Sequence, residues 1–224
     1  MTYSPLLLSL RAASIATLIT FVSGIYIAFL TTKLRRLKGL VDGFLTLPLV
    51  LPPTVVGFFL LVFLGKNSVI GKFLIQYDKS IVFSSSATII ASAVVSFPLM
   101  YRTVRGAFEN IDRNMIYVAR TLGLREHTIL LKVMLPNSFS SIMAGTILAF
   151  ARALGEFGAT IMLAGNIPGK TQTMAVAVYS AVQAGNRILA YKWVAVMVVI
   201  SFVSIILMNS LEGSRFQKLG KGVD

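Results

Sequence analysis

Long apolar runs separated by charged stretches dominate the chain from end to end. A continuously apolar run of about 20 residues is typical of a membrane-spanning α-helix, whereas a barrel strand would alternate polar and apolar positions. Residues 171–186 are uncharged but short and only mildly apolar, which indicates an outer-surface or re-entrant helix. The longer runs predict about five spans: 12–32, 43–65, 80–101, a segment between Lys132 and Lys170, and 193–211.

The composition agrees with an all-α, polytopic membrane helix bundle. Of the 224 residues, 56% are apolar and 13% are charged. Soluble domains carry about 25% charged residues, so this chain has too little polar surface to coat a soluble globule. The absence of cysteine excludes disulfides and thiolate metal sites. Since the apolar runs recur throughout and no internal repeat divides them, we expect one transmembrane domain over residues 1–224.

The net charge of +13 could indicate a nucleic-acid partner, but the positions of the basic residues argue against one. They lie in the segments between the predicted spans, where Lys and Arg favour the cytoplasmic side of the lipid bilayer. Segments 33–38, 102–132 and 215–221 together carry thirteen Lys and Arg, whereas the segments on the other side carry seven. This bias predicts an N-terminus outside and a C-terminus in the cytoplasm.

A charged segment at residues 106–136 has a pattern that a simple connector does not need. Its apolar residues recur at steps of three and four, which predicts a short amphipathic helix. Such a helix at the cytoplasmic rim can dock into a groove of a soluble partner or lie on the membrane. The apolar positions are Ile111, Met115, Val118, Ala119 and Leu122, and the polar ones are Asp112, Arg113, Asn114 and Arg120.

The end of this helix and the start of the next span also carry local signals. Gly123 predicts a left-handed C-cap or a close approach to a partner, since a side chain would hinder both. A second short helix is predicted from Arg125 to Val133. Pro136 lacks an amide hydrogen and suits the first turn of a helix, so we expect it to start the fourth span.

The stretch ARTLGLREHTILLKVMLPNS, residues 119–138, resembles the cytoplasmic coupling loop of bacterial ABC import permeases. The family pattern is Glu-Ala-Ala, three residues, Gly, nine residues, then Ile, any residue, and Leu-Pro. The chain keeps the second alanine as Ala119, the glycine as Gly123 and the Leu-Pro as Leu135 and Pro136. Tyr117 and Val118 replace the Glu and the first alanine, and Val133 replaces the Ile conservatively. The resemblance implies that ATPase subunits couple to transport through Val118, Ala119, Arg120, Gly123, Val133, Leu135 and Pro136.

Three further stretches resemble the molybdate ABC transporter permease family: LTLPLVLPPTVVGFFLL (45–61), SFPLMYR (96–102) and FARALGEFGATIMLAGNIPGKTQT (150–173). The resemblance implies a permease of the bacterial or archaeal inner membrane that receives molybdate, or tungstate, from an extracytoplasmic binding protein. A second copy of the chain would complete the pathway. A sulfate or thiosulfate permease stays open as the alternative.

The same resemblance assigns ATP hydrolysis to another chain. The sequence contains no phosphate-binding loop of the GxxxxGK[ST] type, so the nucleotide must bind to a partner ATPase. We therefore expect a transport subunit rather than an enzyme, with no cofactor and no metal. From topology and the resemblance, the turn-rich stretch AGNIPGKTQT, residues 164–173, is assigned to docking of the binding protein.

Charges and prolines inside the spans are the candidates for the translocation pathway. Arg152 and Glu156 are four residues apart, which places them on one helix face. An unpaired charge near the bilayer centre costs at least about 2.5 kcal/mol, so we expect the two to pair. They either lock the bundle or present Arg152 to a passing dianion. Prolines remove backbone hydrogen bonds, so a kink or a gate is predicted at Pro48, Pro52 and Pro53.

A channel or secondary transporter that works without ATP is the alternative from a different class. It would need titratable residues or selectivity rings within the spans, and only Arg152 and Glu156 are available there. It would also leave unexplained why residues 119–138 resemble a coupling loop.

Overall fold

The computed structural model describes residues 4–34, 36–77 and 80–220, with side chains except for Ile75, Asn209 and residues 211–220. Regular structure in these ranges is helical, as the sequence predicts. Arg35, Lys79 and Lys221, which contribute to the charge bias, lie outside the described residues. The helices are α1 (Ser4–Thr32), α2 (Lys38–Val50), α3 (Pro53–Leu64), α4 (Val69–Ile75), α5 (Ser85–Glu109), α6 (Arg113–Thr121), α7 (Glu126–Ile129), the π-helix η1 (Leu130–Met134), α8 (Leu135–Leu154), α9 (Gly158–Ala164), α10 (Met174–Gln183) and α11 (Arg187–Gly220).

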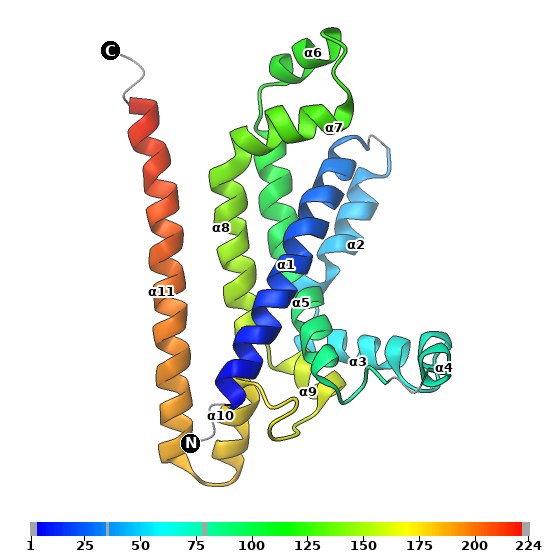
Figure 1. Ribbon diagram of the computed structural model, residues 1–224, viewed down its shortest axis with the longest axis vertical. Helices are drawn as coiled ribbons and strands as arrows, with labels where there is room; N and C mark the ends of the chain where they lie inside the picture. Colours follow the sequence, from blue (N-terminus) through cyan, green and yellow to red (C-terminus); the bar gives the residue numbers. More distant parts are fainter. Residues whose placement is uncertain (1–3, 35, 78–79, 221–224) are drawn as a thin grey trace.

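The helices form an elongated bundle with two different ends. α1, α5 and α8 make its centre, α2 lies along α5 and α1, and α11 stands beside α8 (Figure 1). α6 and α7 lie at one end, here called the α6 end, at the top of Figure 1. α3, α4, α9 and α10 gather at the opposite end, here called the α10 end. Both α1 and α11 run toward the α6 end.

Small residues bring the central helices together. Gly24 of α1 faces α5, and a Cβ on this glycine would lie 2.9 Å from the Cγ of Met100. Ala13, Ala16 and Ala28 of the same helix are fully buried. Small side chains let helix backbones approach closely, which is how helices associate in lipid. This packing makes α1 and α5 the core of the bundle.

Four helical segments in the described part of the chain are long and apolar enough to cross a membrane: α1, α5, the continuous stretch Glu126–Leu154, and α11 up to Met208. The bent pair of α2 and α3 adds a fifth if both belong to one span. α10 has 10 residues, and a helix of that length is about 15 Å long, half of a bilayer core of about 30 Å. The predicted all-α membrane bundle of about five spans is confirmed.

The second predicted span, residues 43–65, is broken rather than continuous. The axis of the span bends by 111° between α2 and α3. Leu51 and Pro52 each precede a proline and adopt extended ψ angles of 143° and 135°, because the helical conformation is disfavoured for a residue before proline. Pro53 then starts α3, where a missing amide hydrogen is tolerated. Pro48 lies inside α2 without ending it, so the two later prolines cause the break.

The fourth span differs from the prediction at both ends. Pro136 lies in the first turn of α8, as expected, but α8 continues a helix that already begins at Glu126, so the proline does not start the span. Proline cannot bond to the carbonyl four residues earlier and clashes with it. The π-helical turn η1, which immediately precedes α8, widens the helix where this bond is missing. The span ends at Leu154, and residues 155–157 separate it from α9.

Two glycines allow α3 to pack tightly on α9. A Cβ at Gly57 would lie 2.7 Å from the Cα of Ala159, and one at Gly158 would lie 2.9 Å from the Cβ of Pro53. Real Cβ atoms do not approach other atoms so closely, so both positions require glycine unless the helices separate. The contact ties the two short helices of the α10 end to each other.

Gly57→Ala is expected to lower the stability of the purified protein by about 1–3 kcal/mol, because the added methyl group meets backbone that cannot rotate away. Gly43→Ala is the matched control, since a Cβ at this position of α2 meets nothing within 4 Å. Alanine is the better helix former by up to about 1 kcal/mol, so the control should be neutral or stabilising. Thermal unfolding in detergent, followed by circular dichroism, measures both. Equal unfolding temperatures for the two variants would contradict the tight contact.

Candidate functional site

The helix predicted in the charged segment is α6, and both its start and its inner face are clear. Asp112 caps it by accepting a hydrogen bond from the amide of Asn114 (2.9 Å), a common role of aspartate at a helix start. Ala119 is buried in a core cluster that also contains Phe108 and Ile129. A larger side chain at Ala119 would have to displace these neighbours. The small residue thus anchors α6 on the bundle.

Gly123 ends α6 in the left-handed conformation, with φ of +76°. Its amide donates to the carbonyl of Arg120 (2.9 Å), and the amide of Leu124 donates to the carbonyl of Ala119 (3.1 Å). This pair of hydrogen bonds is the Schellman motif, in which the left-handed residue is usually glycine. The structure therefore has the C-cap that the sequence predicts. A Cβ at Gly123 would meet nothing within 4 Å, so the surface beyond it is open.

Three apolar side chains of α6 and its C-cap point away from the bundle. Met115, Val118 and Leu122 are exposed, Leu122 by 74%; we call them the α6 patch. The sequence pattern assigned them to one face with Ile111 and Ala119, but the structure buries the latter two and leaves the patch outside. Apolar side chains gathered on a rim helix are typical of a surface that a partner covers.

Glu126, at the start of α7, joins α6 to the end of α1. Its carboxylate accepts a hydrogen bond from the Nε of Arg120 (2.8 Å) and pairs with the Nζ of Lys33 (3.0 Å). The hydrogen bond to this carboxylate raises the pKa of Arg120. All three side chains are well exposed, so each contact contributes only about 0–1 kcal/mol. Glu126 therefore acts mainly by fixing the position of α6 relative to the turn that follows α1.

The remaining predicted coupling residues lie in η1 and in the first turn of α8. Val133 in η1 and Leu135 at the start of α8 are partly buried against the cluster that contains Ala119. Pro136 is exposed and follows the widened turn. Four members of the predicted set are thus exposed: Val118, Arg120 and Gly123 on α6 and its C-cap, and Pro136 on α8.

Arg152 and Glu156 form the expected pair, but not on one helix face. Arg152 lies in the last turn of α8, and Glu156 lies in the break before α9. The Nη1 of Arg152 donates to Oε2 of Glu156 (2.7 Å), and the amide of Ala159 donates to Oε1 (2.7 Å). The carboxylate group is buried, whereas the Arg152 side chain is 30% exposed. Glu156 thereby ties α8 to the first turn of α9.

The bend of the second span lies next to this pair. Gly158, two residues after Glu156, packs against Pro53 at the start of α3. Two features that the sequence analysis assigned separately to the pathway are therefore neighbours at the α10 end. Pro48 is set apart from them, inside α2.

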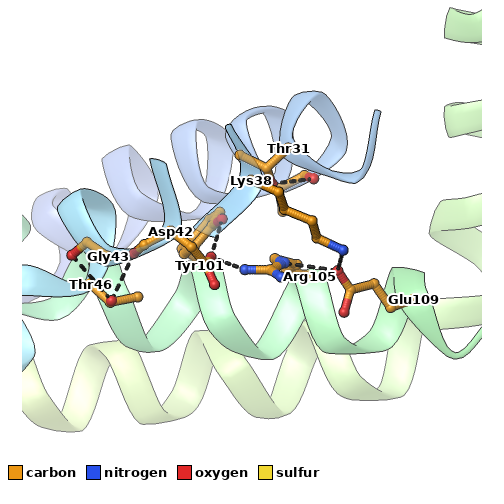
Figure 2. Close-up of polar contacts among 9 residues, drawn as sticks. Thr31, Lys38, Asp42, Gly43, Thr46, Tyr101, Arg105 and Glu109 are labelled. Carbon is orange, nitrogen blue, oxygen red and sulfur yellow. Dashed lines mark hydrogen bonds and ion pairs between the residues drawn. The ribbon is translucent and has the colours of Figure 1, made fainter. Parts of the chain in front are cut away.

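A polar network at the α6 end was not singled out from the sequence. Asp42 of α2 accepts a hydrogen bond from the hydroxyl of Tyr101 (2.7 Å) and pairs with Arg105, both on α5 (Figure 2). Arg105 and Lys38 of α2 share Glu109 at the end of α5. A signal was present in the sequence, because Asp42 is the only acidic residue among the first 77.

Ionic contacts, rather than nucleophiles or metal ligands, make up these sites. In the ranges that the structure describes, no group of three or more His, Cys, Asp or Glu could hold a metal ion. The carboxylates of Asp42, Glu109, Glu126 and Glu156 each pair with Arg or Lys. Such an arrangement can hold helices together and transmit movement between them.

Known sequences agree with this picture along nearly the whole chain. Residues 20–215 match the family described as binding-protein-dependent transport system inner membrane component. The molybdenum transport system permease protein ModB of Haemophilus influenzae is 39% identical over 225 residues, which cover 99% of this chain and 98% of that protein. ModB of Escherichia coli K12 is 38% identical over 222 residues, which cover 98% and 97% of the two chains.

Solved structures share the fold at low sequence identity. The MetNI methionine ABC transporter in inward-facing conformations aligns with a TM-score of 0.73 and 15% identity, covering 92% of both chains. A bacterial ABC transporter that imports the acidic polysaccharide alginate aligns with a TM-score of 0.70 and 14% identity, covering 96% of this chain and 78% of that one. This chain therefore belongs to the family of binding-protein-dependent transport system inner membrane components, as a multi-pass permease subunit of an ABC importer and not an enzyme.

Proposed function

We propose that this permease carries molybdate, and tungstate as a related oxyanion, from an extracytoplasmic binding protein into the cell. The observation that supports it best is the identity of 38–39% to ModB permeases over nearly the full length of both chains. A sulfate or thiosulfate importer is the competing assignment. None of the described site residues distinguishes one tetrahedral oxyanion from another. The choice of molybdate therefore rests on the similarity to the ModB permeases.

Two ATPase subunits are proposed to bind from the cytoplasm, each at the α6 patch of one copy of the permease. The patch is apolar and exposed, and Gly123 beside it leaves room for a partner. The sequence itself lacks a phosphate-binding loop. In this assignment Val118, Arg120 and Gly123 contact the ATPase, while the partly or fully buried members of the set position α6: Ala119, Val133 and Leu135, with Pro136 at the widened turn.

The chain is proposed to act as one transmembrane domain, residues 1–224, together with a second copy of itself. One bundle of about five spans without an internal repeat supplies half of a two-fold pathway. The α6 end is then the cytoplasmic end, with the N-terminus outside and the C-terminus inside. The basic segments 33–38 and 102–132, near the α6 end, support this orientation.

The α10 end would face outward and receive the binding protein. The loop between α9 and α10 lies there and exposes Asn166, Gly169 and Lys170. The bend at Pro52 and Pro53, with the neighbouring Glu156, is proposed to border the pathway. We infer a locking role for Glu156, because both of its carboxylate oxygens are engaged, while the partly exposed Arg152 can still meet a passing anion.

The complete complex in liposomes, with its ATPase and binding protein, is expected to accumulate labelled molybdate when ATP is supplied. Tungstate should compete for uptake, and a large excess of sulfate should not, if the binding protein selects molybdate and tungstate as proposed. Uptake without ATP is the background to subtract. Accumulation of sulfate instead of molybdate would replace the substrate by the competing assignment, and ATP-independent flux equal to the ATP-driven flux would contradict coupled import.

A further inference from the structure

α2 is the least embedded helix of the bundle. None of its residues is buried, and Leu40, Phe44 and Val50 are 75%, 76% and 80% exposed. Leu45 packs partly against the core cluster of α1 and α5. Since a helix in lipid gains little from apolar burial alone, polar contacts with neighbours become important for its position.

Five side chains join the first turns of α2 to the last turns of α5. We call Lys38, Asp42, Tyr101, Arg105 and Glu109 the clasp (Figure 2). The hydroxyl of Tyr101 donates to Oδ1 of Asp42 (2.7 Å), and Arg105 pairs with the same oxygen. The Nε of Arg105 donates to Oε1 of Glu109 (2.9 Å), which also pairs with the Nζ of Lys38 (2.8 Å). Asp42 and Lys38 of α2 are thus joined through Arg105 and Glu109 of α5, and Tyr101 of α5 adds a second contact to Asp42.

The centre of the clasp is shielded from water. Tyr101 is fully buried, and the side chains of Arg105 and Asp42 are 15% and 31% exposed. Charge-assisted hydrogen bonds in such surroundings are stronger than contacts between exposed ions. Removing the charge of Asp42 leaves Arg105 short of a partner in a shielded place and takes from α2 its most protected polar contact with α5.

The clasp lies where the coupling loop leaves the bundle. α5 ends at Glu109, and α6 begins at Arg113. At its other end, α2 leads through the bend of 111° into α3, which packs on α9 through Gly57 and Gly158. The chain thus connects α6 directly to the last turn of α5, and the clasp connects that turn to α2 and the bend.

We propose that the clasp makes α2 follow α5 during the transport cycle, so that Asp42 and Arg105 are positioning residues for ATP-driven gating. The proposal rests on the proposed assembly with ATPase subunits at the α6 patch. Helices that move together as rigid bodies need a contact that persists through the movement. Without the clasp, α2 no longer follows α5, while α1, α5 and α8 stay packed through their own small residues.

Asp42→Asn tests this directly, because it keeps an oxygen for Tyr101 and removes the charge that pairs with Arg105. In liposomes with ATPase and binding protein, the variant should assemble and hydrolyse ATP normally, yet move about tenfold less molybdate per ATP, within the usual range of coupling energies. Asp42→Glu should restore most of this ratio. Arg102→Gln is the matched control: it removes an exposed charge one turn away on α5, and no ion pair joins Arg102 to another described residue.

A second readout follows α2 itself and does not depend on the transported ion. The chain contains no cysteine, so spin labels can be placed at Phe44→Cys on α2 and Val198→Cys on α11, both exposed positions. One labelled and one unlabelled copy are assembled with cysteine-free partners. ATP should change the distance between the labels in the parent chain and in Asp42→Glu, and should not change it in Asp42→Asn.

Wild-type transport per ATP together with a normal ATP-dependent distance change in Asp42→Asn would overturn the proposal. A joint loss of assembly, hydrolysis and uptake would overturn it as well, because Asp42 would then serve folding only. If the parent complex moves no molybdate, the proposed substrate is wrong, whereas the label distances still decide whether the clasp couples α2 to α5.

Discussion

Gly123→Arg is expected to abolish ATP-driven uptake by separating the ATPase subunits from the permease. Gly123 has φ of +76° and borders the α6 patch, and a side chain there would project into open space. In the complex, that space is where the ATPase would approach. Disruption at the centre of an interface costs about 2 kcal/mol or more, a factor of about 30 in affinity. Co-purification of the ATPase with the permease and uptake in liposomes measure the effect.

Two further variants separate partner loss from misfolding. Gly123→Ala carries only the strain of a left-handed residue with a side chain, about 1–2 kcal/mol, and should keep most of the ATPase. Gly185→Arg places the same bulk and charge at a glycine with φ of +70° and equally open surroundings, in the turn between α10 and α11. It should co-purify with the ATPase normally. Normal assembly and transport by Gly123→Arg would place the docking surface elsewhere.

Glu156→Ala is expected to cause the largest loss of stability. The buried carboxylate accepts hydrogen bonds from Arg152 and from the amide of Ala159, both at 2.7 Å. The variant leaves a cation without its partner and an amide without its acceptor. Breaking a buried pair costs about 3–5 kcal/mol. Because the Arg152 side chain is 30% exposed, water compensates part of this cost, and we expect about 2–3 kcal/mol. Thermal unfolding in nanodiscs measures it.

The double variant Arg152→Met with Glu156→Ala shows how much of this loss comes from the stranded cation. It should be more stable than Glu156→Ala alone, because no charge is left without a partner. Glu156→Gln keeps an acceptor for Ala159 and isolates the ion pair. If Glu156→Ala unfolded at the wild-type temperature, the pair would not lock α8 to α9, and the interpretation in which Arg152 faces the pathway would be favoured.

Local chemistry made α6 and its C-cap predictable. Asp112 and Gly123 act on backbone groups two to four residues away, so their effects follow from the neighbouring sequence. The periodicity of the segment predicted the helix correctly. It did not separate buried Ala119 from exposed Val118, because these adjacent positions face different surroundings that only the packed bundle provides.

The broken helices were harder to predict from the sequence. The prolines at 48, 52 and 53 signal a disturbed helix, but the signal does not say that Pro48 is tolerated and that the chain turns by 111° after Leu51. Pro136 suggested a helix start, whereas the structure absorbs it in a helix by a π-helical turn. The single prolines at 48 and 136 stay within helices, whereas the consecutive Pro52 and Pro53 take Leu51 and Pro52 out of the helical conformation.

By itself, the sequence determined that this is an α-helical membrane protein, where most of its spans lie, and how α6 ends, because hydropathy and backbone capping act over a few neighbouring residues. The pairing of Arg152 with Glu156 also followed from their spacing, but only the tertiary structure decided the other partners of the buried and half-buried acidic groups. Asp42 bonds to Tyr101, 59 residues away in the chain, and Glu156 reaches the amide of Ala159 only because the helix breaks before α9. Such contacts depend on how the helix backbones lie against one another, and close packing at small residues such as Gly24 and Gly57 sets those positions across the bundle.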